Sequence, residues 1–147
     1  MSIQYVSEDI SIPKFQKRIM TRWIKDTITS EGKVTGDISF IFCSDEYLLE
    51  VNKQYLNHDY FTDIITFDYV EDNVISGDIF ISCDRVRENA AEFNTGFDNE
   101  LCRIIIHGVL HLTGYKDKSK KDKLLMTAKE DFYLNMLSDS LLIIKKS

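Results

Sequence analysis

The chain has 147 residues, a formal net charge of −6 and an apolar content of 44%. These values predict one folded domain over residues 1–147 with its own core, and they exclude a disordered chain. The negative net charge argues against a protein that binds nucleic acid through its overall charge, so any contact with nucleic acid must come from a local basic patch.

No stretch is long and apolar enough for a membrane span, and the N-terminus lacks the basic and apolar regions of a signal peptide. The three cysteines, Cys43, Cys83 and Cys102, are odd in number, far apart and without a C-x-x-C pair. They indicate reduced, mostly buried thiols, and we therefore expect a cytoplasmic protein.

The first elements follow from apolar spacing. Residues 2–7 alternate, which predicts a strand. Pro13 suits the first turn of a helix, and the apolar spacing over residues 14–28 predicts a helix there that ends near Gly32.

β-Branched and aromatic residues over 34–43 predict a second strand. Ser44 is a suitable N-cap for a helix over residues 45–56. A polar loop over 57–62 then leads into a strand over 63–69.

The second half begins with an expected turn over residues 70–76 and a strand over 77–82 that pairs with the strand before it. Residues 84–94 and 98–113 are then expected to be helical.

A capping box of Ser119 and Asp122 predicts a last helix through Leu137. Its expected apolar side consists of Leu124, Leu125, Ala128, Phe132 and Leu137. The apolar run over 141–144 is compatible with packing or with a frayed end. The element order predicts an α/β or α+β fold, with a small mixed sheet of about four strands and flanking helices around a buried helix.

That buried helix carries the most informative pattern. It is apolar almost all the way round from residue 101 to 112, yet it contains His107 and His111, which lie on one face four residues apart. Gly114 is suited to end the helix, so the chain can turn back and bring Asp117 towards both histidines. Two imidazoles and one carboxylate predict a catalytic metal site with room for water. The alternative is that both histidines are satisfied core residues.

A divalent ion at this site would acidify a bound water and polarise a carbonyl or phosphoryl oxygen. The ligand spacing matches that of metzincin peptidases, with Asp117 in the last place. Those enzymes need a glutamate directly after the first histidine as general base, and this chain has Gly108 there. A metallopeptidase is therefore the weaker alternative.

The segment His107-Gly108-Val109-Leu110-His111-Leu112-Thr113-Gly114-Tyr115 closely resembles the signature of the YbeY family. Further motifs of that family appear upstream in the same order: Asn52-x-x-Tyr55, Thr62-Asp63-Ile64-Ile65-Thr66-Phe67 and Gly77-Asp78-Ile79. The resemblance implies a metal-dependent, single-strand-specific endoribonuclease that acts in ribosomal RNA maturation. It also implies Zn²⁺ held by His107, His111 and Asp117, an RNA substrate and association with the ribosome.

Two positions depart from the family pattern. Asp117 stands where the family usually has a third histidine, so iron or manganese would also suit the site. Leu56 stands where the family commonly has an arginine, which can hold phosphate with two hydrogen bonds. Arg103 and His58 are candidate replacements, although a surface charge or a loop hydrogen bond explains each of them more simply. Asp63 is a candidate catalytic residue that orients a ligand or a water, or else caps a loop.

Residues 116–123 contain five lysines beside the proposed metal site. Such a run is usually a solvated face, but several of its lysines crowd the start of the last helix, where the helix dipole disfavours cations. We therefore expect an RNA phosphate contact here, with Lys116, Lys118, Lys120 and Lys121 as candidates. A ribosome-assembly factor whose metal only braces the core is the remaining alternative.

Overall fold

The computed structural model describes the backbone of residues 2–146 and the side chains of residues 2–138. Its strands are β1 (Ile3–Ser7), β2 (Val34–Cys43), β3 (Ile64–Asp68) and β4 (Val74–Ser82). Its helices are α1 (Lys17–Ser30), α2 (Asp45–Leu56), α3 (Cys83–Glu92), α4 (Phe97–Thr113) and α5 (Lys120–Lys146). No helix among these described residues is long and apolar enough to cross a membrane.

The strands form one sheet in the order β1-β2-β4-β3. β1 and β4 both run parallel to β2, whereas β3 runs antiparallel to β4 and forms one edge of the sheet. The expected mixed four-stranded sheet of an α/β fold is therefore confirmed, and so is the pairing of the last two strands.

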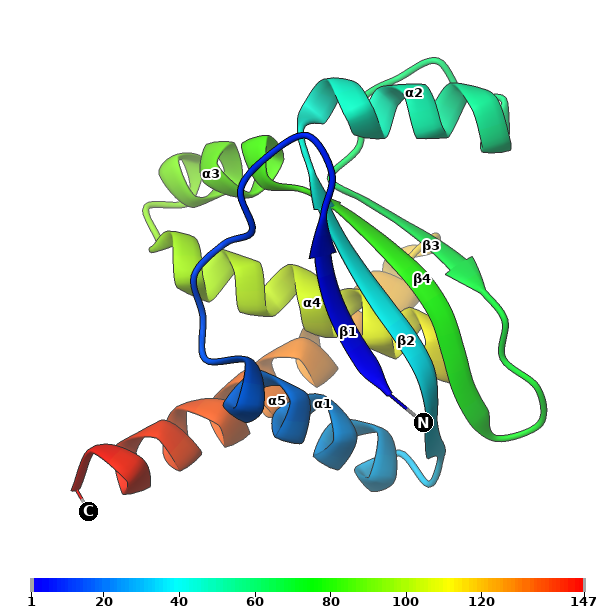
Figure 1. Ribbon diagram of the computed structural model, residues 1–147. Coiled ribbons are helices and arrows are strands. Elements are labelled where there is room, and N and C mark those ends of the chain that lie inside the picture. Colours follow the sequence, from blue (N-terminus) through cyan, green and yellow to red (C-terminus); the bar gives the residue numbers. More distant parts are fainter. Residues whose placement is uncertain (1, 147) are drawn as a thin grey trace.

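Helices cover the two faces of the sheet unequally. α1, α4 and α5 lie together on one face (Figure 1) and enclose the main core, to which the sheet contributes Ile38, Phe40 and Ile79. α2 packs on the other face, where Leu48 and Val51 join a smaller cluster with residues of β2 and β3. Because α4 lies between the sheet and α5, it is buried along most of its length, as the sequence predicted.

The predicted start of the first helix was wrong. α1 begins at Lys17, so Pro13 lies before the helix instead of in its first turn. The segment before α1 has no regular secondary structure, and its Phe15 ring packs against Tyr5 and Phe42 of the sheet, at centroid distances of 5.0 and 5.9 Å.

The turn after β3 is also shorter than expected, because β4 begins at Val74 and pairs there with the start of β2. Asp72 in this turn has a left-handed φ of 54°, which aspartate tolerates better than most residues.

The last helix differs most from its prediction. The Ser119 hydroxyl accepts the Asp122 amide at 3.0 Å, as a capping residue should, but α5 continues past Leu137 to Lys146. The side chains of residues 141–144 lie outside the described residues. Of the five residues expected on its apolar side, only Leu137 is buried, and the other four are exposed. The buried face instead carries Met126, Glu130, Tyr133 and Leu137.

Candidate metal centre

Close packing of α4 on the sheet fixes the direction of its histidines. A β-carbon at Gly108 would lie 3.0 Å from Ile64 Cδ1 and 3.1 Å from Ile79 Cγ2, so this position faces β3 and β4 at close range. His107 and His111 project from a different side of α4 and are partly exposed. A glutamate at position 108 would point into the sheet instead of towards the histidines, which argues against peptidase chemistry of the metzincin kind.

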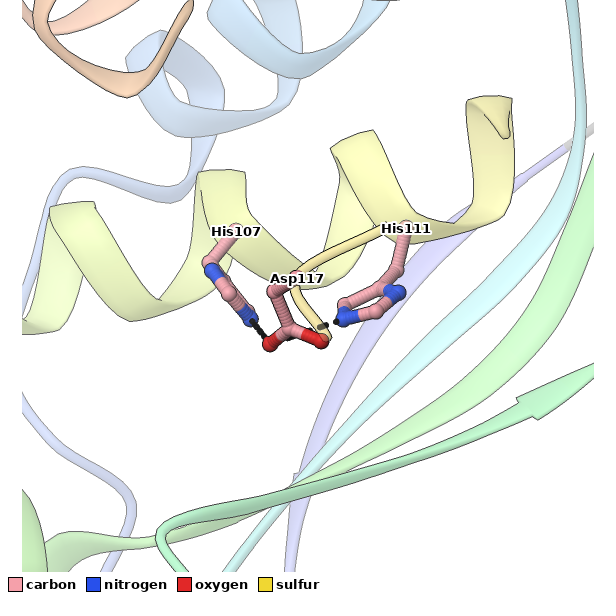
Figure 2. A group of neighbouring side chains, drawn as sticks. All are labelled: His107, His111 and Asp117. Atoms are coloured by element: carbon pink, nitrogen blue, oxygen red, sulfur yellow. Dashed lines mark ion pairs between the residues drawn. The ribbon is translucent and has the colours of Figure 1, made fainter. Parts of the chain in front are cut away.

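The end of α4 returns the chain to the histidines. Gly114 has a φ of 115°, a left-handed conformation that costs glycine little, and the next amide, of Tyr115, bonds back to the Leu110 carbonyl at 3.0 Å. The turn brings Asp117 between both rings (Figure 2), with its Oδ2 atom 3.3 Å from His107 Nε2 and 3.3 Å from His111 Nε2. The structure therefore brings together the three residues that the sequence proposed as ligands.

The spacing of these donor atoms fits a metal ion. Donor atoms from the three residues all lie within 4.8 Å of one another. Zinc bonds to nitrogen and oxygen of about 2.0–2.1 Å at tetrahedral angles place two ligand atoms about 3.3 Å apart. Both nitrogen–oxygen separations have this value, and two imidazoles with one carboxylate are a known zinc donor set.

A buried carboxylate on α5 orients the first histidine. Glu130 Oε2 lies 2.6 Å from His107 Nδ1, and Glu130 Oε1 accepts a hydrogen bond from the Arg103 guanidinium at 2.9 Å. A proton on Nδ1 leaves the lone pair of Nε2 free for a metal, which is the usual arrangement of a ligating histidine. Sequence reasoning did not single out Glu130.

Nearby carboxylates change the proton affinity of His107. Burial by itself lowers its pKa, but the hydrogen bond to Glu130 and the charges of Glu130, Asp117 and Asp63 outweigh burial, so the pKa lies above its ordinary value. Because a metal binds only the neutral imidazole, protons and metal compete at this residue.

Arg103 lies one turn before His107 and is committed to α5. Besides its bond to Glu130, it donates to Asp131 Oδ1 at 2.7 Å. Both of these contacts neutralise its charge within the protein, which makes Arg103 a poor substitute for a phosphate-binding arginine. Its position instead supports Glu130, and through Glu130 it supports His107.

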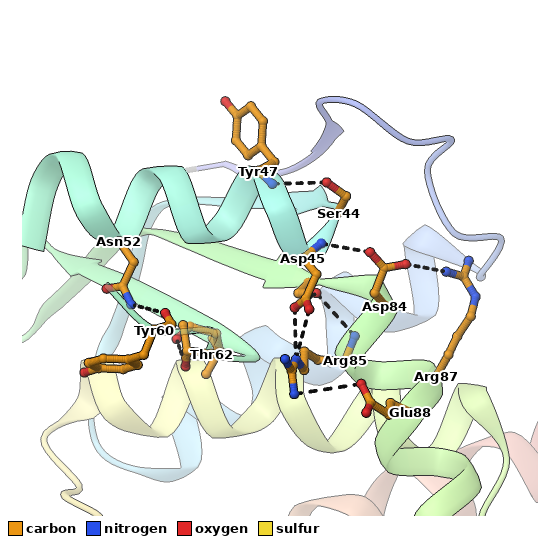
Figure 3. Close-up of polar contacts among 12 residues, drawn as sticks. Ser44, Asp45, Tyr47, Asn52, Tyr60, Thr62, Asp84, Arg85, Arg87 and Glu88 are labelled. Atoms are coloured by element: carbon orange, nitrogen blue, oxygen red, sulfur yellow. Dashed lines mark hydrogen bonds and ion pairs between the residues drawn. The ribbon is translucent and has the colours of Figure 1, made fainter. Parts of the chain in front are cut away.

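Asp63 lies at the end of the loop between α2 and β3, and shares a cavity wall with His107. Burial raises the pKa of its carboxyl group, and the charge of Asp117 adds to this, against the opposing effects of His107 and Arg85. The loop is held in place by the Asn52 side chain, which donates to the Tyr60 carbonyl at 2.9 Å (Figure 3). The structure thus assigns Asn52 of the N-x-x-Y motif to loop anchoring.

The start of α3 is fixed beside the same loop. The Arg85 Nε atom donates to the two Asp45 carboxylate oxygens at 3.0 and 3.2 Å (Figure 3). The Arg85 guanidinium also lies over the Phe61 ring, 5.2 Å from the centroid. Asp84 accepts the Asp45 amide at 2.8 Å, which ties the starts of α2 and α3 together.

The remaining candidates are more exposed. Leu56 ends α2 and is 39% exposed. His58 stacks on the Tyr60 ring, with its Nδ1 atom 3.0 Å from the Tyr60 hydroxyl, so the loop itself accounts for its position. The four candidate lysines are all exposed. Two lie in the loop between α4 and α5 and two in the first turn of α5: Lys116, Lys118, Lys120 and Lys121.

A second carboxylate, which is partly buried and follows the last residue of α1, anchors the loop that carries Asp117. Glu31 accepts hydrogen bonds from the hydroxyls of Tyr115 (2.5 Å) and Tyr133 and from Lys129 (3.3 Å). Burial alone raises the pKa of Glu31, but these hydrogen bonds outweigh it, so the pKa lies below its ordinary value of 4.5. Glu31 therefore stabilises the fold above pH 4.5, and this contribution is lost as the pH falls through the lowered pKa.

We expect Glu31→Gln to lower the free energy of unfolding by about 2 kcal/mol at pH 7, because three donors lose a charged acceptor. Urea denaturation at pH 7 and at pH 3 measures this difference, which should narrow at pH 3. Glu8→Gln, at an exposed position, is the control. A difference that stays equal at both pH values would contradict the assigned role.

Fold and site together define an α/β domain that carries a candidate mononuclear metal centre. A family model described as endoribonuclease YbeY matches residues 2–138. The chain is 54% identical over 139 residues to an endoribonuclease YbeY of Parabacteroides distasonis, covering 95% of this chain and 98% of the relative. A relative of the same name from Flavobacterium psychrophilum is 57% identical over 114 residues, which is 78% of this chain and 81% of the relative.

The solution structure of TM1509 from Thermotoga maritima superposes with a TM-score of 0.67 at 28% identity, covering 95% of this chain and 91% of that one. The chain belongs to the YbeY endoribonuclease family.

Proposed function

We propose that this protein is a metal-dependent endoribonuclease that cleaves single-stranded RNA during ribosomal RNA maturation in the cytoplasm. The donor cluster of His107, His111 and Asp117 carries the proposal, because these three residues could hold a metal ion and two of them lie in the segment that resembles the family signature. The RNA substrate is supported by the names of the relatives. The ribosomal role rests on the resemblance of the motifs.

We propose Zn²⁺ as the resident ion, held by His107, His111 and Asp117, since their spacing and chemistry suit it. When bound, such an ion supplies an electrophile for a phosphoryl oxygen and acidifies water. Glu130 holds the proton on His107 Nδ1, which leaves the Nε2 lone pair free to bind a metal. Arg103 holds Glu130 in place through its hydrogen bond to Glu130 Oε1.

Asp63 is our candidate for proton transfer. Its carboxyl group shares the cavity wall with His107, and its raised pKa brings its protonation equilibrium closer to neutral pH. The attacking oxygen comes either from water or from a ribose 2′-hydroxyl. RNA products that end in a 2′,3′-cyclic phosphate would identify the 2′-hydroxyl, and linear ends would identify water.

We propose that RNA phosphates contact the lysines that follow α4. Replacing Lys118, Lys120 and Lys121 with glutamine should weaken RNA binding and reduce the slope of log K against log salt by about 0.7 for each lysine that contacts a single strand. Fluorescence anisotropy at several salt concentrations measures this slope. The same change at Lys17, Lys25 and Lys33, on or just after α1, is the control. An unchanged slope in the first variant would show that the run is only a solvated face.

Cleavage of labelled RNA tests the proposed activity. The zinc-loaded protein should cut a single-stranded RNA internally and leave the matching duplex intact, while a casein substrate should stay whole. Tight RNA binding without cleavage would instead indicate an assembly factor with a structural metal.

A further inference from the structure

A cavity of about 210 Å³ opens beside the candidate metal centre. Its walls come from α3, α4 and α5 and from the residue before β3, and His107 forms part of them. Because His107 also carries one of the three donor atoms, a group seated in this cavity would lie next to any substrate held at the donor cluster.

The charge of this cavity disfavours a phosphate group. Asp63, Glu100 and Glu130 contribute three carboxyl groups to its walls, against one guanidinium, that of Arg103, and the imidazole of His107. Arg103 is already paired with Glu130 and Asp131, so the cavity presents excess negative charge. Such a surface repels phosphate but accepts hydrogen bonds from neutral N–H donors.

The other lining groups suit a planar, neutral ring. Phe93 is 62% exposed and offers a ring face, whereas Val86 and Ile104 are buried and make apolar walls. The Asn89 amide provides both a donor and an acceptor. The Thr95 hydroxyl donates to Glu100 Oε1 at 3.0 Å and holds that carboxylate in place. Aromatic stacking combined with a few hydrogen bonds to the base edge is how proteins recognise unpaired bases in RNA.

We propose that this cavity binds the base of a nucleotide next to the scissile phosphodiester, and that it selects bases with an exocyclic amino group over uracil. Carboxylates accept from the amino group of cytosine, and an asparagine amide matches the amino edge of adenine. Uracil has no amino group, and its single N3–H donor is flanked by the carbonyl oxygens O2 and O4, which the carboxylates of such a site repel. This inference rests on the proposed endoribonuclease function and adds a specificity site to it.

Sequencing of product ends from a degenerate single-stranded RNA pool tests the inference. With the zinc-loaded protein, uracil should be depleted about fivefold or more at one position flanking the cut, as one good base contact predicts. The double variant Asn89→Ala, Glu100→Gln should lose that depletion, whereas Asn99→Ala, Glu92→Gln, at exposed positions outside the cavity, should keep it.

Cleavage without a uracil bias in the unmodified protein would overturn the specificity site and leave the endoribonuclease function intact. The same conclusion would follow if the bias survived in a folded double variant. No cleavage of the pool under any metal condition would overturn the proposed function itself, and the inference with it.

Discussion

Asp117→Ala should reduce bound metal from about one equivalent to a small fraction of one. Asp117 Oδ2 is the donor that lies 3.3 Å from both histidine nitrogens, so its loss leaves two ligands on one helix. Loss of an orienting partner alone weakens metal binding about 10- to 100-fold, and loss of a direct ligand should cost more than that. RNA cleavage should fall with the metal content.

The histidine variant provides the contrast. Asp117→His restores a third nitrogen donor, and the partly exposed loop after Gly114 can adjust to the longer side chain, so metal and activity should be largely retained. Asp59→Ala, at an exposed carboxylate in another loop, is the control. Elemental analysis of untagged protein gives the metal content. Equal metal in the unmodified protein and in Asp117→Ala would place the third ligand elsewhere.

Glu130→Gln should affect the fold and the metal centre together. Glu130 is only 9% exposed, and it bonds both His107 and Arg103, so the neutral amide removes a charged acceptor from two donors. We expect the metal-free protein to lose about 1–3 kcal/mol of unfolding free energy and the metal affinity to fall about 10- to 100-fold. Urea denaturation and calorimetric zinc titration measure the two effects.

Asp131→Asn is the matched control for Glu130→Gln. It removes the other carboxylate that pairs with Arg103, is exposed by 54%, and lies beside Glu130 on the same helix. Its effect on stability should stay below about 1 kcal/mol, as for surface ion pairs, and zinc affinity should not change. Zinc binding by Glu130→Gln as tight as in the unmodified protein would show that Glu130 does not orient His107.

Most of the architecture could be predicted from local patterns. The helix with His107 and His111, its end at Gly114 and the strand pairs that flank it follow from apolar spacing and turn chemistry. The three candidate ligands came from spacing alone. Two histidines at i and i+4 lie on one face of a helix, and a glycine turn directly after them brings the next carboxylate, Asp117, back towards that face. The reason for a glycine at position 108 became clear only from the packing, because its close approach to Ile64 and Ile79 cannot be predicted from the sequence.

The error on α5 has a physical cause. Its buried face runs through Met126, Glu130, Tyr133 and Leu137, so a glutamate occupies a position where an apolar residue would be expected. Periodicity arguments reject a charge in such a row and favour the exposed stripe through Leu124 and Phe132 instead. A buried carboxylate is tolerated here because Arg103 and His107 both bond it. The signal that could have identified Glu130 was the helical spacing of its buried neighbours.

The role of Arg103 was equally hidden. Its place one turn before His107 suggested a phosphate contact, but its partners lie 27 and 28 residues further along the chain. Only the packing of α5 against α4 brings those carboxylates to the guanidinium. An arginine whose spacing suggests a substrate contact can therefore instead hold the carboxylate that orients a metal-binding histidine.

The central claim is that the metal centre carries out RNA cleavage, and it is tested most directly by measuring metal content and cleavage on the same protein sample. Protein purified without a histidine tag should contain about one equivalent of zinc, lose it together with cleavage of single-stranded RNA on chelation, and regain both when one equivalent is returned. Less than a tenth of an equivalent of any transition metal after reconstitution, or cleavage that persists in the metal-free protein, would contradict the assignment of His107, His111 and Asp117 as the metal centre of a nuclease.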